Sequence, residues 1–169
     1  MEQVYKIKKS LRIPMVIAII LSIPVFYDIF NKGLAKQHVF IVGTLVFVFL
    51  VFAANNLLRK ISVFKDKISI LSITGKKVIP LNEISSIDGI SLGRRQYITI
   101  THKKRTYLIP NSFNDFTKIL VAIKELVHED IIGQGLKDIQ NFPLSRTGDT
   151  ITAWITVILL AGILIIRVI

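Results

Sequence analysis

Residues 61–73 read Ile-Ser-Val-Phe-Lys-Asp-Lys-Ile-Ser-Ile-Leu-Ser-Ile. Apolar and polar residues alternate on both sides of the charged centre, a period that is typical of half-buried strands. The stretch therefore predicts a β-hairpin with its turn at residues 65–67. The next turn, Thr74-Gly75-Lys76, leads into a strand at residues 77–81, where Pro80 favours an edge or a bulge because it has no amide hydrogen for a central ladder.

The strand pattern continues to residue 109. Residues 84–92 form a weaker strand with Gly89 inside it, and residues 97–101 and 106–109 form a further hairpin around His102-Lys103-Lys104. The corner at residues 110–112 then ends the strands. The sequence therefore predicts five or six antiparallel strands in succession.

An amphipathic helix follows the strands. Ser112 and Asp115 have the spacing of a capping box at a helix start. Apolar residues then recur at helical spacing, so one stripe of the helix is expected to pack on the half-buried strands. The stripe consists of Phe113, Phe116, Ile119, Leu120, Ile123, Leu126 and Val127. Residues 129–150 contain three glycines and a proline, and we interpret them as a linker with a short helical turn.

Two apolar segments match the thickness of a bilayer. Residues 39–58 are a nearly unbroken run of Val, Phe, Leu and Ile, about the 20 residues that a spanning helix needs. Residues 151–169 carry a single charge, Arg167, near one end, and Trp154 near the other, where the membrane interface favours an aromatic ring. Both segments are predicted to be transmembrane helices.

A third apolar segment, at residues 11–30, is weaker. Pro14 and Pro24 interrupt it, which a spanning helix tolerates when neighbouring groups satisfy the freed carbonyls. A cleaved signal peptide with a cut near residues 33–35 is the alternative, although Asp28 interrupts the approach to that site and another apolar segment follows directly. We expect a spanning helix that is kinked or uses snorkelling ends.

Basic residues near the segment ends predict the orientation. Cytoplasmic flanks of membrane helices are enriched in Lys and Arg. Four such residues precede the first segment (Lys6, Lys8, Lys9 and Arg12), two follow it (Lys32 and Lys36), and four follow the second (Arg59, Lys60, Lys65 and Lys67). The N-terminus and the soluble domain are therefore expected in the cytoplasm, and the C-terminus outside.

The sequence thus divides into a transmembrane hairpin at residues 1–58, a soluble domain at residues 59–128, the linker at residues 129–150 and a last span at residues 151–169. The predicted fold class is a membrane α-helical protein with three spans and a cytoplasmic α+β domain. Net charge is +11, from 22 Lys and Arg against 11 Asp and Glu. An anionic bilayer surface accounts for this excess, so no nucleic-acid partner is expected.

The soluble part resembles the bacterial pleckstrin-homology-like (PH-like) domains of small membrane proteins. The resemblance covers residues 59–128 and is carried by residues 69–84, which read Ser-Ile-Leu-Ser-Ile-Thr-Gly-Lys-Lys-Val-Ile-Pro-Leu-Asn-Glu-Ile, by the strand at residues 97–101, and by Ile109-Pro110 at the entry to the helix. It implies antiparallel strands capped by a C-terminal helix, and a role in lipid binding, protein binding or scaffolding. Two departures are one strand fewer than the seven of a full pleckstrin-homology fold, and the third span.

No pattern typical of an enzyme is present. The three histidines, His38, His102 and His128, lack the spacing of metal ligands or of a catalytic pair, and His102 is interpreted as a residue of a hairpin turn. Without cysteine, thiolate chemistry is excluded. No phosphate-binding or dinucleotide-binding motif occurs. We therefore expect no catalytic residue, no cofactor and no metal.

Charged turns are the remaining candidates for function. In a simple meander, alternate turns share one end of the sheet. This would gather six basic residues facing lipid headgroups, namely Arg59, Lys60, Lys76, Lys77, Arg94 and Arg95. A second cluster at the opposite end, Lys103, Lys104 and Arg105, would suit an acidic protein partner. The alternative for both clusters is that they are solvated turns which only protect strand edges.

The sequence predicts a membrane-anchored binding or scaffolding module at the cytoplasmic membrane face, contacting anionic lipid headgroups or a protein partner. The alternative is an accessory subunit of a larger transport or secretion complex, or a homo-oligomer, with no ligand of its own. Small residues in the apolar segments, such as Gly43 and Gly162, would favour helix packing of that kind.

Overall fold

The computed structural model describes residues 2–31, 36–144 and 147–168. The chain divides into two compact units. A mixed domain combines residues 1–8 with residues 58–146, and a helical unit combines residues 9–57 with residues 147–169. Each unit is discontinuous in sequence, because the first two long helices lie between an N-terminal strand and the rest of the mixed domain.

The helical unit holds three long helices, α1 (Lys9–Asn31), α2 (Lys36–Leu58) and α5 (Gly148–Val168). α1 contains Pro14 and Pro24 within an otherwise continuous helix and packs against α5. Within the described residues, Lys9–Tyr27 of α1 and Gly148–Ile166 of α5 are long and apolar enough to cross a membrane, judged by length and composition. α2 contributes a shorter apolar stretch, Val46–Leu58.

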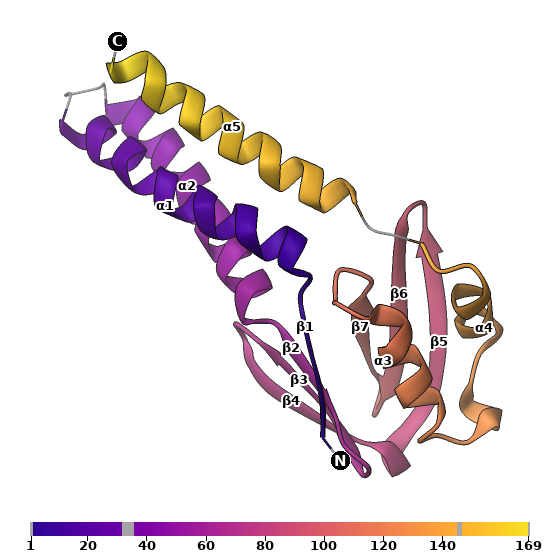
Figure 1. Cartoon of the computed structure of the whole chain (residues 1–169). Coiled ribbons are helices and arrows are strands. Elements are labelled where there is room, and N and C mark those ends of the chain that lie inside the picture. Colours follow the sequence, from indigo (N-terminus) through magenta and orange to yellow (C-terminus); the bar gives the residue numbers. More distant parts are fainter. Residues whose placement is uncertain (1, 32–35, 145–146, 169) are drawn as a thin grey trace. The chain divides into compact units, whose positions relative to one another are not determined.

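The mixed domain is α+β, as the sequence predicts. A first sheet has the antiparallel order β1-β2-β3-β4 and a second sheet the antiparallel order β5-β6-β7 (Figure 1). The strands of the first sheet are β1 (Gln3–Lys6), β2 (Lys60–Val63), β3 (Lys67–Ser72) and β4 (Gly75–Pro80). Those of the second are β5 (Ile84–Leu92), β6 (Arg95–His102) and β7 (Arg105–Pro110).

Strand β1 is the element that the sequence analysis did not anticipate. Its residues pair with β2 in the register Gln3↔Val63 to Lys6↔Lys60. The signal is the alternation of exposed Val4 and Lys6 with buried Tyr5 and Ile7. In the sequence, these four residues next to a long apolar segment indicate only its basic flank.

The core of the first sheet follows its period of two. Tyr5, Ile61 and Ile70 are buried in one cross-strand row, and Val63, Ile68 and Ile79 are buried in the row two residues further on. The intervening rows face the other side of the sheet, because neighbouring residues of a strand point to opposite faces. One face of the sheet is therefore apolar and buried, while on the outward face the central Ser62 and Ser69 are buried and the edge-strand residues Val4 and Val78 are exposed.

Helix α3 (Phe116–Lys124) buries the central part of the predicted stripe, including Phe116, Ile119 and Ile123. Leu126 and Val127, also expected in the stripe, lie beyond the end of the helix, and Leu126 is exposed. Its N-cap is Asp115, which has a positive φ of 52° and makes no side-chain capping bond. The capping box expected from Ser112 is therefore wrong. Ser112 is instead buried, and its carbonyl oxygen accepts a hydrogen bond from the Lys8 amide at 3.1 Å.

Residues 129–141 are folded onto the second sheet. They form a 3₁₀ turn (Glu129–Ile131) and helix α4 (Gln134–Asn141), whose Leu136 and Ile139 are buried. The backbones of Gly89 and Gly135 approach so closely that a Cβ on Gly135 would lie 2.1 Å from the Gly89 carbonyl oxygen. The range expected as a linker thus contains a packed helix that covers the edge of β5.

Candidate functional site

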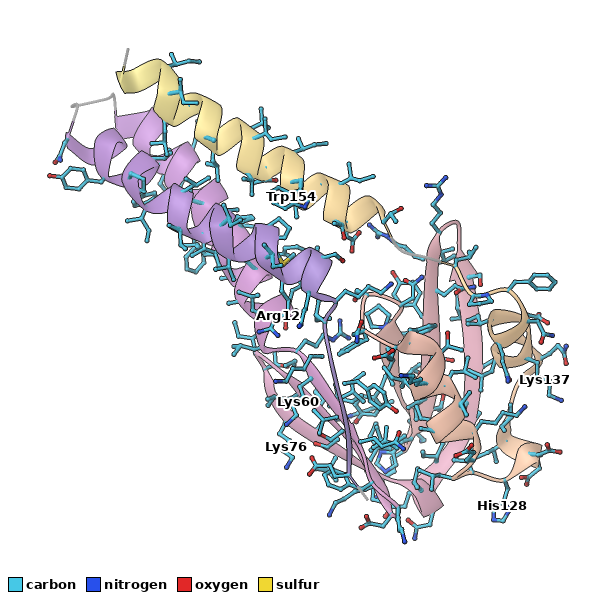
Figure 2. All side chains as sticks on the ribbon, viewed as in Figure 1. Arg12, Lys60, Lys76, His128, Lys137 and Trp154 are labelled. Atoms are coloured by element: carbon cyan, nitrogen blue, oxygen red, sulfur yellow. The ribbon has the colours of Figure 1, made fainter. Side chains whose placement is uncertain are left out.

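Three lysines form one row across the first sheet. In the register, Lys6 lies opposite Lys60, Lys60 opposite Leu71, and Leu71 opposite Lys76. Directly opposite residues of an antiparallel pair point to the same face. Lys6, Lys60 and Lys76, the lysine row, therefore project from the outward face at one end of the sheet, where Figure 2 shows Lys60 and Lys76 near one another.

The lysine row is an unbalanced arrangement of charge. Like charges directly opposite one another destabilise a sheet, and Lys6 faces Lys60. Within the part of the chain that the structure describes, none of the three lysines forms an ion pair. The same face carries exposed Val4, Leu71 and Val78. The surface is thus both cationic and apolar.

Two of the six basic residues predicted as one cluster are held by the second sheet instead. Arg59 donates a hydrogen bond from Nη2 to the Leu108 carbonyl oxygen at 2.8 Å, and its guanidinium lies 5.7 Å from the centre of the Phe113 ring. Lys77 Nζ lies 5.7 Å from the centre of the Tyr107 ring. These contacts join the two sheets. Both side chains have a structural role in the domain.

Arg94 and Arg95 belong to the second sheet, at the tip of the β5–β6 hairpin. The two-residue turn is Gly93-Arg94, with Gly93 at a φ of +59°, which glycine adopts without strain. Both arginines are exposed. Residues 90–95, which we call the arginine hairpin, also expose Ile90 and Leu92. The structure thus brings Lys60 and Lys76 together and places the arginines on a different sheet.

Two buried amides tie the arginine hairpin to the chain that leads to α5. Gln96 donates from Nε2 to the Phe142 carbonyl oxygen at 2.8 Å and accepts from the Leu144 amide at 2.8 Å. Asn111 donates from Nδ2 to the carbonyl oxygens of Arg94 at 3.2 Å and Leu144 at 3.0 Å. Residues 142–144 are thereby fixed beside the hairpin tip.

The second predicted basic cluster lies at the β6–β7 turn. Lys103 and Lys104 both have positive φ, 44° and 63°, a conformation that Asn or Gly adopts more readily. Glu83 accepts from Lys103 Nζ at 2.6 Å and pairs with His102 Nε2 at 2.8 Å. These two hydrogen bonds, Lys103 first, hold the pKa of Glu83 below its ordinary value. Lys104 and Arg105 remain exposed.

A cavity of about 540 Å³ lies at the end of the domain opposite the lysine row, near His128 (Figure 2). Its wall is mixed, with apolar residues from the 3₁₀ turn Leu81–Glu83 and from the segment after α3, and charged residues from the turn between β2 and β3. The charged and polar members are Lys65, Asp66, Asn82, His128 and Asp130. Among the residues described, no three His, Asp or Glu side chains gather as a metal site.

No protein-family model, no curated protein and no solved structure matches this chain. The site is therefore defined by the geometry of this chain alone. Lys6 is the candidate residue that the sequence analysis missed, because its membership of the row depends on strand β1.

Proposed function

We infer that the protein is a membrane-anchored binding module with three spans, whose mixed domain lies at the cytoplasmic face and contacts anionic lipid headgroups. The lysine row is the observation that carries this proposal. Three like charges in one row, without ion pairs to described residues, repel one another, and an external anion relieves that repulsion. Phosphate-bearing headgroups supply that anion at a membrane surface.

Strand pairing supports an even number of crossings between β1 and β2. β1 precedes α1 and β2 follows α2, yet the two strands are hydrogen-bonded neighbours in one sheet. Both ends of the α1–α2 segment therefore lie on the same side of any membrane. If α1 crosses, as its length and composition permit, α2 must cross back. α5 then supplies a third crossing.

We also propose that the mixed domain is PH-like. The sequence predicts one strand fewer than the seven of a full pleckstrin-homology fold, and among the described residues β1, which precedes the helix pair, brings the number to seven. The strands form sheets of four and three, followed by helix α3. On this interpretation the two helices are inserted between the first and second strands of the domain.

Chain connectivity supports contact between the lysine row and headgroups. Lys6 lies three residues before the start of α1, and Lys60 two residues after the end of α2. If both helices span, these lysines lie within a few residues of the interface. Each basic residue near an anionic leaflet contributes about 1 kcal/mol.

The test is joint charge reversal of the lysine row in the full chain. Lys6→Glu, Lys60→Glu and Lys76→Glu together should reduce the number of phosphatidylglycerol molecules that the purified protein retains in native mass spectrometry. The matched control, Lys65→Glu, Lys104→Glu and Lys137→Glu, changes net charge equally at exposed sites away from the row. Equal lipid retention by the two triple variants would refute headgroup binding by the row.

A second candidate function is that of an accessory subunit of a membrane complex. An apolar groove of about 620 Å³ lies between α1 and α2, and a Cβ on Gly43 would lie 3.8 Å from the Phe26 ring. Small residues permit close helix packing in membranes. Gly43→Leu would fill the groove and should abolish copurification of a stoichiometric membrane partner. Copurification that survives this change would place the partner elsewhere.

A further inference from the structure

We propose that the arginine hairpin and Phe142 form an apolar anchor that enters the interfacial layer of the bilayer. The anchor consists of Ile90, Leu92 and Phe142. It is separate from the lysine row, which is on the other sheet. The inference rests on the proposed function in one respect, namely that α5 spans the membrane.

The anchor residues are exposed far more than a folded domain requires. Leu92 is 64% exposed, Phe142 75% and Ile90 43%. Leu92 lies opposite Arg95, and Ile90 opposite Tyr97, so both project from the face of the sheet opposite to that of buried Ile98. Ile90 and Leu92 thus lie on one face of the hairpin tip, and Phe142 is tied by its carbonyl oxygen to Gln96, whose side chain lies on the other face. Exposed apolar groups gathered at one place indicate a surface that is covered in the functional state.

The hairpin tip cannot move away from residues 142–144 without breaking buried hydrogen bonds. Gln96 is 2% exposed and Asn111 1% exposed, so solvent does not readily replace their bonds to Phe142, Leu144 and Arg94. Buried amides that lose their partners carry a large desolvation cost. The hairpin tip and Phe142 are therefore held together as one rigid unit, with exposed apolar side chains on both faces of the tip.

The short segment between Leu144 and α5 limits how far these residues can lie from the membrane. Four peptide units separate Leu144 from Gly148, the first residue of α5, and four residues extend at most about 14 Å. If α5 spans, its first turn lies at the headgroup level. The anchor is then within reach of the interfacial layer. This limit follows from the length of the connecting segment alone.

The chemistry of the surface favours lipid over a protein partner. Arg94 and Arg95 are exposed beside the apolar residues, and an arginine guanidinium binds phosphate oxygens in a bidentate manner. No acidic residue lies within residues 89–97. Apolar side chains flanked by cations suit the boundary between acyl chains and anionic headgroups. A bilayer interface supplies both complementary parts, namely acyl chains for the apolar side chains and anionic headgroups for the arginines.

The natural chain has no cysteine, so single-cysteine variants of the full protein can each carry one environment-sensitive fluorophore. Leu92→Cys and Phe142→Cys probe the anchor, Leu126→Cys probes an exposed site at the opposite end of the domain, and Leu159→Cys probes α5. The proteins are reconstituted in vesicles of phosphatidylcholine and phosphatidylglycerol. Emission maxima are measured, together with quenching by nitroxide-labelled lipid and by aqueous iodide.

The anchor predicts blue-shifted emission and quenching by lipid nitroxide at positions 92 and 142, with iodide quenching only at position 126. If positions 92 and 142 are quenched by iodide as position 126 is, while position 159 is quenched by lipid, the anchor is refuted and the spanning of α5 stands. If position 159 is also quenched by iodide, the membrane placement of α5 fails, and the anchor fails with it.

Discussion

At the scale of single residues, Gln96 tests whether buried side chains fix the segment before α5. Gln96→Met keeps the size but removes both hydrogen bonds, so we expect the Leu144 amide to open more easily by about 1–3 kcal/mol. Hydrogen exchange of peptides that contain Leu144, measured on the full chain in detergent, reports this directly. Gln134→Met is the matched control at an exposed site. Equal exchange in the two variants would show that the buried amide does not hold the segment.

Glu83 gives a prediction for pH at the same scale. The ion pair with Lys103 lowers the pKa of Glu83 in the folded state, so its contribution to stability is present above the ordinary carboxyl pKa and is lost as pH falls through the lowered value. Glu83→Gln should therefore lower Tm at neutral pH, and the difference from the natural protein should shrink in acid. Thermal unfolding measures this difference in Tm across the pH range. A difference that stayed constant with pH would contradict the assignment.

At the scale of elements, Gly135 tests the packing of α4 on β5. Gly135→Ala would place a methyl group against the Gly89 carbonyl oxygen, which belongs to the backbone and cannot rotate away. We expect a loss of about 1–3 kcal/mol in the free energy of unfolding. The control is Gly148→Ala, where a Cβ meets open space. Similar denaturation midpoints for the two variants would mean that the close approach is not a constraint.

The elements also show what the sequence could predict. The hairpins at residues 61–73 and 97–109 and the stripe of α3 were predictable, because each has a period repeated over many residues. β1 was not, because it spans four residues and pairs with a partner more than fifty positions away. α4 was not, because glycines that usually mark a linker serve here to bring two backbones together.

The candidate site was predictable only in part, for the same reason. Lys60 and Lys76 could be placed at one end of a sheet from the alternation of turns. Arg59 and Lys77 instead contact the second sheet. The sequence could not predict which basic residues do so, because this depends on contacts between the two sheets. Such contacts join distant parts of the chain and leave no local pattern.

At the scale of the whole molecule, the pairing of β1 with β2 makes the topology testable. The two helices between these strands begin and end at one sheet, so the N-terminus and the mixed domain must share a compartment. Breaking the β1–β2 pairing should release the chain before α1 from the sheet that follows α2. Because the Phe64 amide donates to the Lys67 carbonyl oxygen, alternation along the ladder makes Gln3↔Val63 a hydrogen-bonded pair and leaves the Val78 amide facing the open edge of β4. Gln3→Pro should therefore destabilise the domain more than Val78→Pro. Protease resistance of the full chain would compare them, and equal resistance would count against the role of β1.

The most direct test of the account is the sidedness of three single-cysteine variants in oriented membrane vesicles. Glu2→Cys precedes β1, Gly33→Cys lies between α1 and α2 in sequence, and Lys104→Cys lies in the β6–β7 turn. A membrane-impermeant thiol reagent should label positions 2 and 104 from the cytoplasmic side, and position 33 only from the other side. Labelling of position 33 from the same side as position 104, or of position 2 from the opposite side, would contradict the proposed membrane-anchored module.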